Sequence, residues 1–187
     1  MQDSETREDR SGNYNSMTVQ IRSEQAADTP RIAEVTRLAF RQAAHTCGRE
    51  HWLVDELRKA GALTLSLVAV SDLGIVGHVA ASPVTVTKST GDWFGIGPLS
   101  VLPECQKQGI GSRLMEAAMA QLRAGGARGC VLVGDPKFYV RFGFRSDSSL
   151  LVPGVPPEVS LSLRFGPCDD QGTVAFHPAF LAALNGE

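Results

Sequence analysis

The sequence of 187 residues has no long hydrophobic run and no strong charge of either sign. No stretch is apolar for long enough to span a membrane, and its beginning lacks the pattern of a signal peptide. The formal net charge is only −2, so no broad basic field favours nucleic acid as a partner. These absences predict a cytoplasmic protein that binds neither membrane nor nucleic acid.

Cysteine is also scarce, and the four cysteines form no close pair and no metal-ligand pattern: Cys47, Cys105, Cys130 and Cys168. Cys130 lies in an apolar run, which is typical of a buried reduced thiol. With 43% hydrophobic residues, the chain can bury one core. We therefore expect a single domain over 17–187 without a metal, preceded by a flexible polar leader over 1–16.

The most informative segment is a glycine-rich turn between an apolar strand, expected over 92–102, and a helix, expected over 108–123. The turn reads Gln106-Lys107-Gln108-Gly109-Ile110-Gly111-Ser112. Closely spaced glycines at a helix start let the backbone approach a ligand, and the first N–H groups of the helix are directed at an anion. The segment therefore predicts a phosphate or pyrophosphate site.

Two common nucleotide loops are excluded by spacing. A dinucleotide-binding loop requires Gly-x-Gly-x-x-Gly, but Leu114 stands at the third glycine position after Gly109, and Ser100 stands there after Gly95. A nucleoside-triphosphate loop requires Gly-Lys followed by Ser or Thr, and the sequence contains no Gly-Lys pair. The pattern that remains is Gln-x-x-Gly-x-Gly.

That pattern resembles the pyrophosphate loop of the GNAT superfamily, the GCN5-related N-acetyltransferases. Three further segments resemble this family in the expected order: a strand over 99–101 followed by Pro103, a buried strand over 129–134, and the aromatic segment Phe138–Phe144. Gly134-Asp135-Pro136 before the aromatic segment is similar to the small YhbS-like acetyltransferases. The resemblance covers about 17–144, and residues 144–187 are less typical.

The order of elements read from hydrophobic periodicity agrees with an α/β (α+β) fold, a mixed central sheet with helices on both faces. The resemblance adds that this sheet is mainly antiparallel and that the fourth and fifth strands splay apart. Besides the elements already named, we expect strands over 17–22, 63–70, 74–86, 159–165 and 172–176, one at Phe144, and helices from Asp28-Thr29-Pro30 and over 51–60, 137–142 and 179–184.

The resemblance implies transfer of an acetyl group from acetyl-CoA to a primary amine, with no metal. In this family the pantetheine arm bonds the fourth strand at the splay, and Gly97-Pro98 offers a local reason for one, because Pro98 lacks a ladder donor and Gly97 permits a bulge. The expected cofactor-binding residues are Leu99, Ser100, Val101, Gln106, Lys107, Gln108, Gly109, Ile110, Gly111, Ser112, Gly134 and Phe138.

Tyr139 occupies the position of the family's tyrosine acid. A phenol is neutral at pH 7 and can protonate a departing thiolate. The alternative is a core tyrosine with its hydroxyl at the surface.

The general base stays open among Glu50, His51, Asp55, Glu56, His45 and a water chain. His78 is expected to be a sheet histidine, and Arg58 to pair with an acidic neighbour.

Three functions stay open at this point: an active N-acetyltransferase, a non-catalytic acyl-CoA-binding sensor or regulatory module, and a pure interaction domain. The acceptor is either a small-molecule amine or a protein amine, and the donor either acetyl-CoA or a longer acyl-CoA. The apolar segment 179–184 covers this chain's own core or a partner's, which makes a homodimer an expectation.

Overall fold

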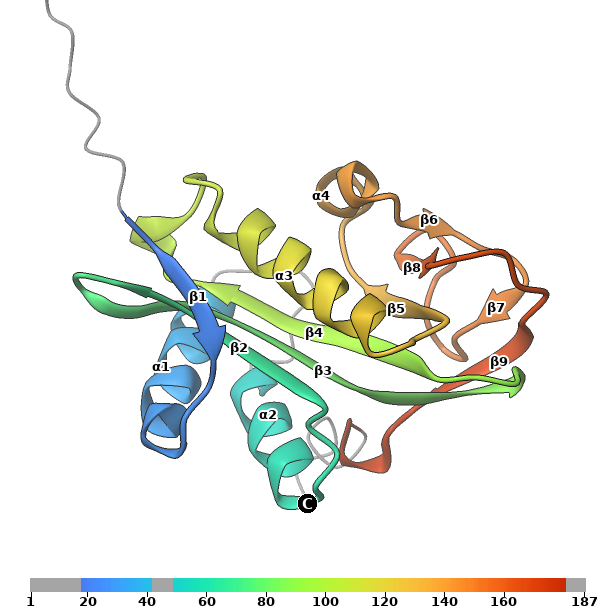
Figure 1. The fold of residues 1–187 in the computed structure, drawn as a ribbon, viewed down its shortest axis with the longest axis horizontal. Helices are drawn as coiled ribbons and strands as arrows, with labels where there is room; N and C mark the ends of the chain where they lie inside the picture. The colour runs from blue at the N-terminus through green and yellow to red at the C-terminus, as the bar shows by residue number, and fades with distance from the viewer. Residues whose placement is uncertain (1–17, 42–48, 181–187) are drawn as a thin grey trace, which may run out of the picture.

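The computed structural model describes residues 18–41 and 49–180, and its centre is a twisted nine-stranded sheet (Figure 1). The strands run in the order β1-β2-β3-β4-β5-β8-β6, and β9 pairs with both β3 and β7. Neighbouring strands are antiparallel except β4 with β5 and β7 with β9. The strands are β1 (Gln20–Ser23), β2 (Leu65–Ser71), β3 (Gly74–Lys88), β4 (Trp93–Val101), β5 (Gly129–Val133), β6 (Arg145–Ser146), β7 (Leu150–Leu151), β8 (Ser160–Arg164) and β9 (Gln171–Phe176).

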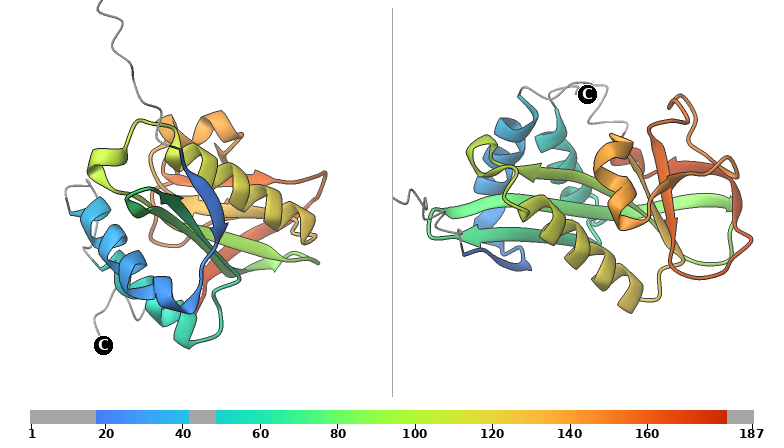
Figure 2. Two further views of the ribbon diagram at one scale, coloured as in Figure 1. Left: turned by 60° about the vertical axis from the view of Figure 1, so that its left-hand side comes forward. Right: turned by 90° about the horizontal axis from the view of Figure 1, so that it is seen from above.

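Helices cover both faces of this sheet (Figure 2). Helix α3 (Ile110–Ala124) lies on one face, and α1 (Thr29–Phe40) and α2 (Glu50–Lys59) lie on the other. The short helix α4 (Pro136–Tyr139) follows β5. Single 3₁₀ turns complete the described elements at Ala26–Asp28, Pro103–Cys105 and Val140–Phe142. The expected fold class is confirmed.

Strands β4 and β5 are paired at one end and separated at the other. Their parallel register covers only Trp93–Gly95 of β4 against Gly129–Val131 of β5. Two residues further along β4, the Gly97–Pro98 peptide is cis, and the register of β4 on β3 shifts between Val79 and Ala81. The expected splay of the fourth and fifth strands is therefore present, with a bulge at Gly97–Pro98. This opens one edge of β4 from that bulge to Val101.

The segment after residue 144 returns to the middle of the sheet. Strand β2 pairs with the first half of β3, and β9 pairs with the second half, with Phe176 opposite Val84. Just before β9, Asp170 accepts hydrogen bonds from Trp93 Nε1 at 2.9 Å and Arg128 Nε at 3.1 Å. The Arg128 guanidinium holds the pKa of the Asp170 carboxyl well below its usual range. After β9, Ala179 and Phe180 pack on the apolar residues of α2.

Several boundaries differ from those expected. The helix expected over 108–123 begins at Ile110, because Gly109 has a φ of +81° and cannot continue it. The helix expected over 137–142 is split into α4 and a 3₁₀ turn, and β7 was not expected. Cys130 is fully buried, as expected, and burial raises the pKa of its thiol. The leader 1–16, Met17, His45, Cys47 and residues 181–184 of the last expected helix lie outside the described residues.

No helix within 18–41 and 49–180 combines the length and the apolar character that crossing a membrane requires.

Candidate active site

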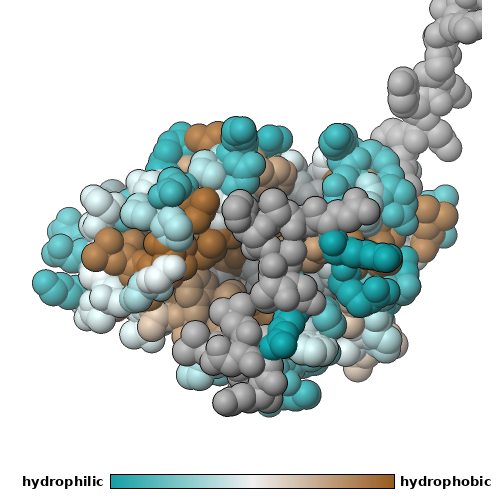
Figure 3. Space-filling model, turned by 180° about the vertical axis from the view of Figure 1, so that it is seen from behind, coloured by the Kyte–Doolittle hydropathy of each residue, from teal (hydrophilic) through white to brown (hydrophobic). Residues whose placement is uncertain are grey.

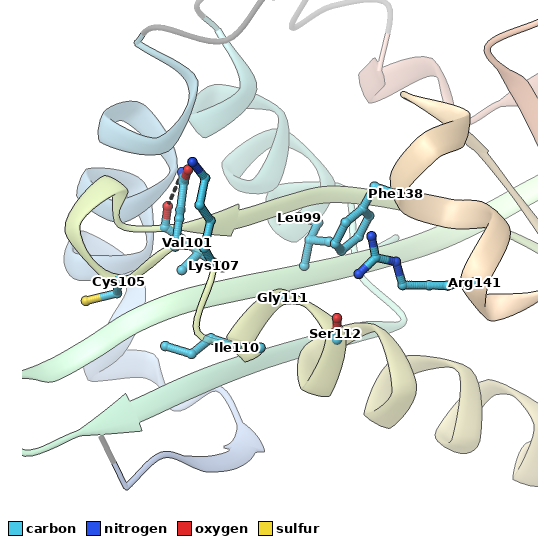
Figure 4. Close-up of a pocket in the computed structure, with 11 residues that line it drawn as sticks. Leu99, Val101, Cys105, Lys107, Ile110, Gly111, Ser112, Phe138 and Arg141 are labelled. Carbon is cyan, nitrogen blue, oxygen red and sulfur yellow. Dashed lines mark hydrogen bonds between the residues drawn. The ribbon is translucent and has the colours of Figure 1, made fainter. Parts of the chain in front are cut away.

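A cavity of about 420 Å³ opens between the end of β4, the start of α3 and α4 (Figure 4). It lies at the open edge of β4, where β5 has diverged. Eleven residues line it: Leu99, Val101, Cys105, Gln106, Lys107, Gly109, Ile110, Gly111, Ser112, Phe138 and Arg141. Nine of these are residues that the sequence predicted as cofactor-binding. Cys105 and Arg141 were not among them.

The start of α3 presents backbone N–H groups to the cavity. The first backbone bond of the helix runs from Arg113 N–H to the Gly109 carbonyl at 3.0 Å. The N–H groups at the start of a helix have no carbonyl partner within it, and in the described part of the chain no side chain caps α3 at Gly109. Lys107 just before it has a φ of +61°, rare for a residue with a side chain. Successive backbone N–H groups in a turn that alternates left-handed and other conformations, as Lys107 to Gly109 does, can form an anion-binding concavity.

The two glycines of the turn have different physical roles. Gly109 adopts a left-handed φ of +81°, and a Cβ there would meet no atom within 4 Å, so conformation alone favours glycine. Gly111 has ordinary helical backbone, and a Cβ there would lie 3.6 Å from Phe138 Cζ and 3.7 Å from Val101 Cγ2. Glycine at 111 therefore widens the cavity between β4 and α4 without being required by the backbone.

The glutamines of the motif brace the turn. Gln106 Nε2 donates to the Val101 carbonyl at 3.1 Å, which ties the loop to the end of β4. Gln108 Nε2 donates to the Glu104 carbonyl at 3.3 Å, and Gln108 does not line the cavity. The side chain of Gln106 thus fixes the distance between the strand edge and the start of α3.

Lys107 and Arg141 are the cationic side chains among the described residues that line the cavity. The Arg141 guanidinium carbon lies 5.0 Å from the centroid of the Phe138 ring, within cation–π distance. Figure 4 shows Phe138 and Arg141 entering from α4 and the turn after it, opposite Lys107. The signal for Arg141 was present in the sequence, because it stands two residues after Tyr139 in the aromatic segment.

Strand β4 contributes alternate residues to the cavity. Leu99 and Val101 line it, whereas the Ser100 side chain points to the opposite face, is 1% exposed and donates to Thr36 Oγ1 at 3.2 Å. Successive side chains on a strand point to opposite faces, so this alternation is expected. Ser100 can therefore reach a ligand at the open edge of β4 only through its backbone.

Tyr139 stands behind the cavity wall. Its ring meets the Phe138 ring edge-on, with centroids 4.9 Å apart, and packs against Phe144 at 6.0 Å. A Cβ at Gly134 would lie 2.5 Å from Tyr139 Cε2, so the absence of a side chain at Gly134 seats the tyrosine. Gly134 itself does not line the cavity. Burial, with a smaller effect of the Asp135 charge, raises the pKa of Tyr139 to about 12.

The face of the sheet under α1 and α2 holds a half-buried polar network that reaches the fully buried His78. Arg58 forms a two-pronged ion pair with Glu24, both bonds being 2.9 Å, and donates to Asp55 at 2.6 Å. Ser66 Oγ donates to Glu24 Oε2 and lies 2.8 Å from His78 Nε2. Because the single Ser66 proton goes to the carboxylate, His78 Nε2 must carry the proton that it shares with Ser66. His78 Nδ1 then has a lone pair and no partner.

The charges of this network follow from burial and pairing. Burial lowers the pKa of His78 to about 4, so the imidazole is neutral at pH 7. Burial acts to raise the pKa of Glu24, but hydrogen bonds from Arg58 and Ser66 outweigh it and hold that pKa below its usual value. His78 is a sheet histidine and Arg58 pairs with acidic neighbours, as the sequence predicted.

Two of the candidate bases on α2 are engaged in ion pairs. Asp55 pairs with Arg58, and Glu56 pairs with Lys59 at 2.7 Å. His51 Nδ1 is buried and has no partner. The residues described here include no group of three or more histidine, cysteine, aspartate or glutamate side chains placed to hold a metal ion.

The chain is similar to known acetyltransferases in sequence and structure. A model of the acetyltransferase (GNAT) domain matches residues 62–146. YhbS of Escherichia coli strain K12, an uncharacterized N-acetyltransferase, is 39% identical over 125 residues, which are 66% of this chain and 72% of that protein. The chain therefore belongs to the GNAT family of acetyltransferases.

Two solved structures resemble this chain over most of their length. A GNAT family acetyltransferase from Brucella melitensis, solved in complex with acetyl-CoA, is 45% identical with a TM-score of 0.77, and the match covers 88% of this chain and 99% of that one. E. coli YhbS, solved in complex with CoA, is 32% identical with a TM-score of 0.79, and the match covers 88% and 93%. Both have the fold that the sequence predicted.

Proposed function

We propose that this protein transfers the acetyl group of acetyl-CoA to a primary amine by direct attack. The observation that carries the proposal is the uncapped start of α3 beside the open edge of β4. One end of the cavity thus offers N–H groups to a diphosphate, and the other offers a strand edge to an amide-containing arm. The complexes of the Brucella melitensis and E. coli relatives with acetyl-CoA and CoA support this reading.

Three groups of residues bind the cofactor, each at a different part of it. The diphosphate is bound by N–H groups of the turn 106–112, with Lys107 and Arg141 supplying positive charge. The pantetheine amides pair with the backbone of Leu99, Ser100 and Val101 at the open edge of β4. Phe138 packs against the arm, and Gly134 acts indirectly by seating Tyr139.

The reaction follows from this placement. The amine nitrogen attacks the thioester carbonyl carbon, a C–N bond forms, and the C–S bond breaks. Backbone N–H groups of β4 near the bulge polarise the carbonyl oxygen. Tyr139, whose phenol is protonated at neutral pH, donates its proton to the departing thiolate. The attacking nitrogen is positively charged in the tetrahedral intermediate, and it loses its extra proton to the base before the neutral amide product forms.

The base acts from the side of the sheet that α2 covers. Asp55 and Glu56 lie on this helix in ion pairs with Arg58 and Lys59. The candidates for the base remain Glu50, His51, Asp55, Glu56 and a water chain. Single replacements Glu50→Gln and His51→Gln test two of them, because loss of the base lowers kcat most at low pH.

A non-catalytic acyl-CoA sensor is the alternative, and one pair of measurements separates the two. Calorimetry with acetyl-CoA measures binding, and release of free thiol in the presence of pools of primary amines and peptides measures transfer. Binding with amine-dependent thiol release is the expected result. Binding without release for any amine would favour the sensor, and absence of binding would overturn both.

A homodimer and a cytoplasmic location remain predictions. Ala179 and Phe180 pack against α2 of the same chain, which accounts for the described part of the apolar C-terminal segment. Analytical ultracentrifugation over a hundredfold range of concentration tests the dimer, and a constant monomer mass would contradict it.

A further inference from the structure

The open edge of β4 presents the backbone groups of two residues to the cavity. Leu102, directly after the strand, donates its N–H to the Val76 carbonyl of β3 at 2.9 Å. In an antiparallel pair, successive residues direct their N–H and C=O groups to opposite sides, so those of Val101 and Leu99 point away from β3. Strand β5 does not meet them, because its register with β4 ends at Gly95. Both residues line the cavity, so these backbone groups are open to a ligand.

Gln106 closes the end of this edge that leads to α3. Its Nε2 donates to the Val101 carbonyl at 3.1 Å, the bond drawn as a dashed line in Figure 4, and Gln106 itself lines the cavity. The side-chain amide therefore stands where an N–H of an added strand would bond to this carbonyl. The first group of the edge that a ligand can use is the N–H of Val101.

Pro98 closes the other end of the edge, because proline has no N–H to donate. Between the two ends lie the Val101 N–H, the Leu99 carbonyl and the Leu99 N–H, in this order from Gln106. Pantetheine has two amides, and its thioester follows the second amide after two carbon atoms. An arm that pairs as a strand accepts from Val101 with its first amide, donates to the Leu99 carbonyl with its second, and brings the thioester carbonyl to the Leu99 N–H.

This register places the thioester where an amine can reach it. Seen from behind, the face of the sheet opposite α3 is hollowed among hydrophobic side chains (Figure 3). An amine that enters from that face has to pass where β4 and β5 have separated, which is beyond Gly95. A thioester beside the Leu99 N–H lies next to the bulge at Gly97–Pro98, inside this opening. The register of the arm thus decides whether the acyl carbon meets the amine.

We propose that Gln106 is a positioning residue that fixes the register of the pantetheine arm on β4. Without the Gln106 amide, the second amide of the arm is free to donate to the Val101 carbonyl instead of the Leu99 carbonyl. This step of two residues draws the thioester back by about 7 Å and gives its carbonyl the Val101 N–H as donor. The inference rests on the proposed acyl-CoA binding and adds the residue that sets the position of the acyl group.

Amide hydrogen exchange, followed by NMR in the full chain with and without saturating acetyl-CoA, tests this assignment. In the wild-type protein, binding is expected to slow the exchange of the Leu99 and Val101 N–H groups by about tenfold or more. The Leu102 N–H is the internal reference, because its bond to Val76 protects it in both states.

Gln106→Met keeps the length of the side chain and removes its donor. In this variant acetyl-CoA is expected to leave the Leu99 N–H unprotected while the Val101 N–H stays protected, because the thioester carbonyl has moved from one to the other. Calorimetry is expected to show an affinity for acetyl-CoA at least as high as in the wild type, because the displaced register adds a way to bind. Gln106→Arg, whose guanidinium again donates, is expected to restore the protection of Leu99.

Steady-state kinetics gives a second readout, with the primary amine that supports thiol release in the wild-type protein. The displaced complex is unproductive and competes with the productive one. In Gln106→Met, kcat and the KM for acetyl-CoA are therefore expected to fall together by about five- to tenfold, with kcat/KM unchanged. Loss of a brace in the turn would instead raise KM, so kinetics distinguishes the two roles of Gln106.

Gln108→Met is the matched control. Gln108 Nε2 donates to the Glu104 carbonyl at 3.3 Å, and Gln108 does not line the cavity. This variant removes a side-chain bond of the same kind from the same turn, but away from the open edge of β4. It is expected to keep the wild-type protection of Leu99, and thermal unfolding checks that each variant is folded.

The outcomes separate the inference from the proposed function. Binding of acetyl-CoA without protection of Leu99 in the wild-type protein overturns the register but leaves acyl-CoA binding intact. Wild-type protection of Leu99 in folded Gln106→Met, or its loss in Gln108→Met as well, also overturns the inference. Weaker binding of acetyl-CoA by Gln106→Met does the same, because it shows that Gln106 only braces the turn. Failure of the wild-type protein to bind acetyl-CoA overturns the proposed function together with the inference.

Discussion

The two faces of the central sheet differ in the source of their polar groups, which is the backbone on one face and side chains on the other. On the face of α3, the candidate cofactor site consists largely of backbone: the start of α3, a left-handed glycine and the open edge of β4. On the face of α1 and α2, the polar groups are side chains that pair with one another, as in the network of Arg58, Glu24, Ser66 and the buried His78. The first face therefore offers backbone groups to a ligand, whereas the side chains of this network on the second face bond mainly to one another.

This difference explains which substitutions are expected to act on cofactor binding and which on catalysis or stability. Backbone sites are sensitive to conformation, so a change of residue matters where φ is positive or where a side chain fills the ligand volume. Side-chain networks are sensitive to burial and protonation.

The largest effect is expected at Gly109. Gly109→Val places a β-branched residue at a φ of +81°, which distorts the turn and withdraws its N–H groups from the diphosphate. Acetyl-CoA affinity is expected to fall by a factor on the order of a thousand. Gly111→Ala is the matched control, because its Cβ makes only ordinary contacts, and it is expected to weaken binding by at most about tenfold. Calorimetry measures both, and equal losses would contradict the distinction between the two glycines.

Tyr139→Phe is expected to lower the catalytic rate without changing the affinity for the cofactor. The ring contacts with Phe138 and Phe144 remain, and only the proton donor is removed. We expect kcat to fall by roughly ten- to a thousand-fold, with little change in CoA affinity. Steady-state rates over pH 6 to 9 check this, and a wild-type rate in the variant across that range would show that Tyr139 only packs and that water is the acid.

Acid is expected to destabilise the face of α1 and α2. An unfolded histidine binds a proton below about pH 6.5, whereas folded His78 stays neutral down to about pH 4. The unfolded chain therefore binds more protons in this window, and stability falls as the pH is lowered through it, by roughly 2 to 3 kcal/mol between pH 6.5 and 4.5. Urea unfolding at several pH values measures how steeply the free energy of unfolding falls as the pH is lowered. This pH dependence should be weaker in His78→Gln, and an unchanged pH dependence would show that other groups cause it.

The smallest effect is expected at Arg141. Arg141→Ala removes one of the two cations that line the cavity, and the affinity for acetyl-CoA is expected to fall about tenfold, with a weaker dependence on salt. Lys137→Ala is the control, because Lys137 is exposed in α4 and does not line the cavity. Equal losses of affinity in the two variants would mean that Arg141 acts only through long-range electrostatic attraction and not by direct contact with the cofactor.

The sequence was most informative where function depends on local backbone. The motif from Gln106 to Gly111 predicted the glycine turn before α3, and the family resemblance, with Gly97-Pro98 as a local reason, predicted the divergence of β4 from β5, because both depend on short-range features. Arg141 was passed over although its motif was recognised. The packing of Phe176 over Gly95 could not be predicted, because it depends on pairings of β3 with β4 and β9 that no local pattern specifies.

The pairing of β9 with β3 also sets an order of assembly. Phe176 and Val84 lie about ninety residues apart, so this contact forms late and closes a large loop. During synthesis, β4, the glycine turn and α3 leave the ribosome well before β9 does. Until β9 arrives, the second half of β3 has an unpaired edge that can pair with another chain. Strand β9 therefore also protects the newly made protein from aggregation.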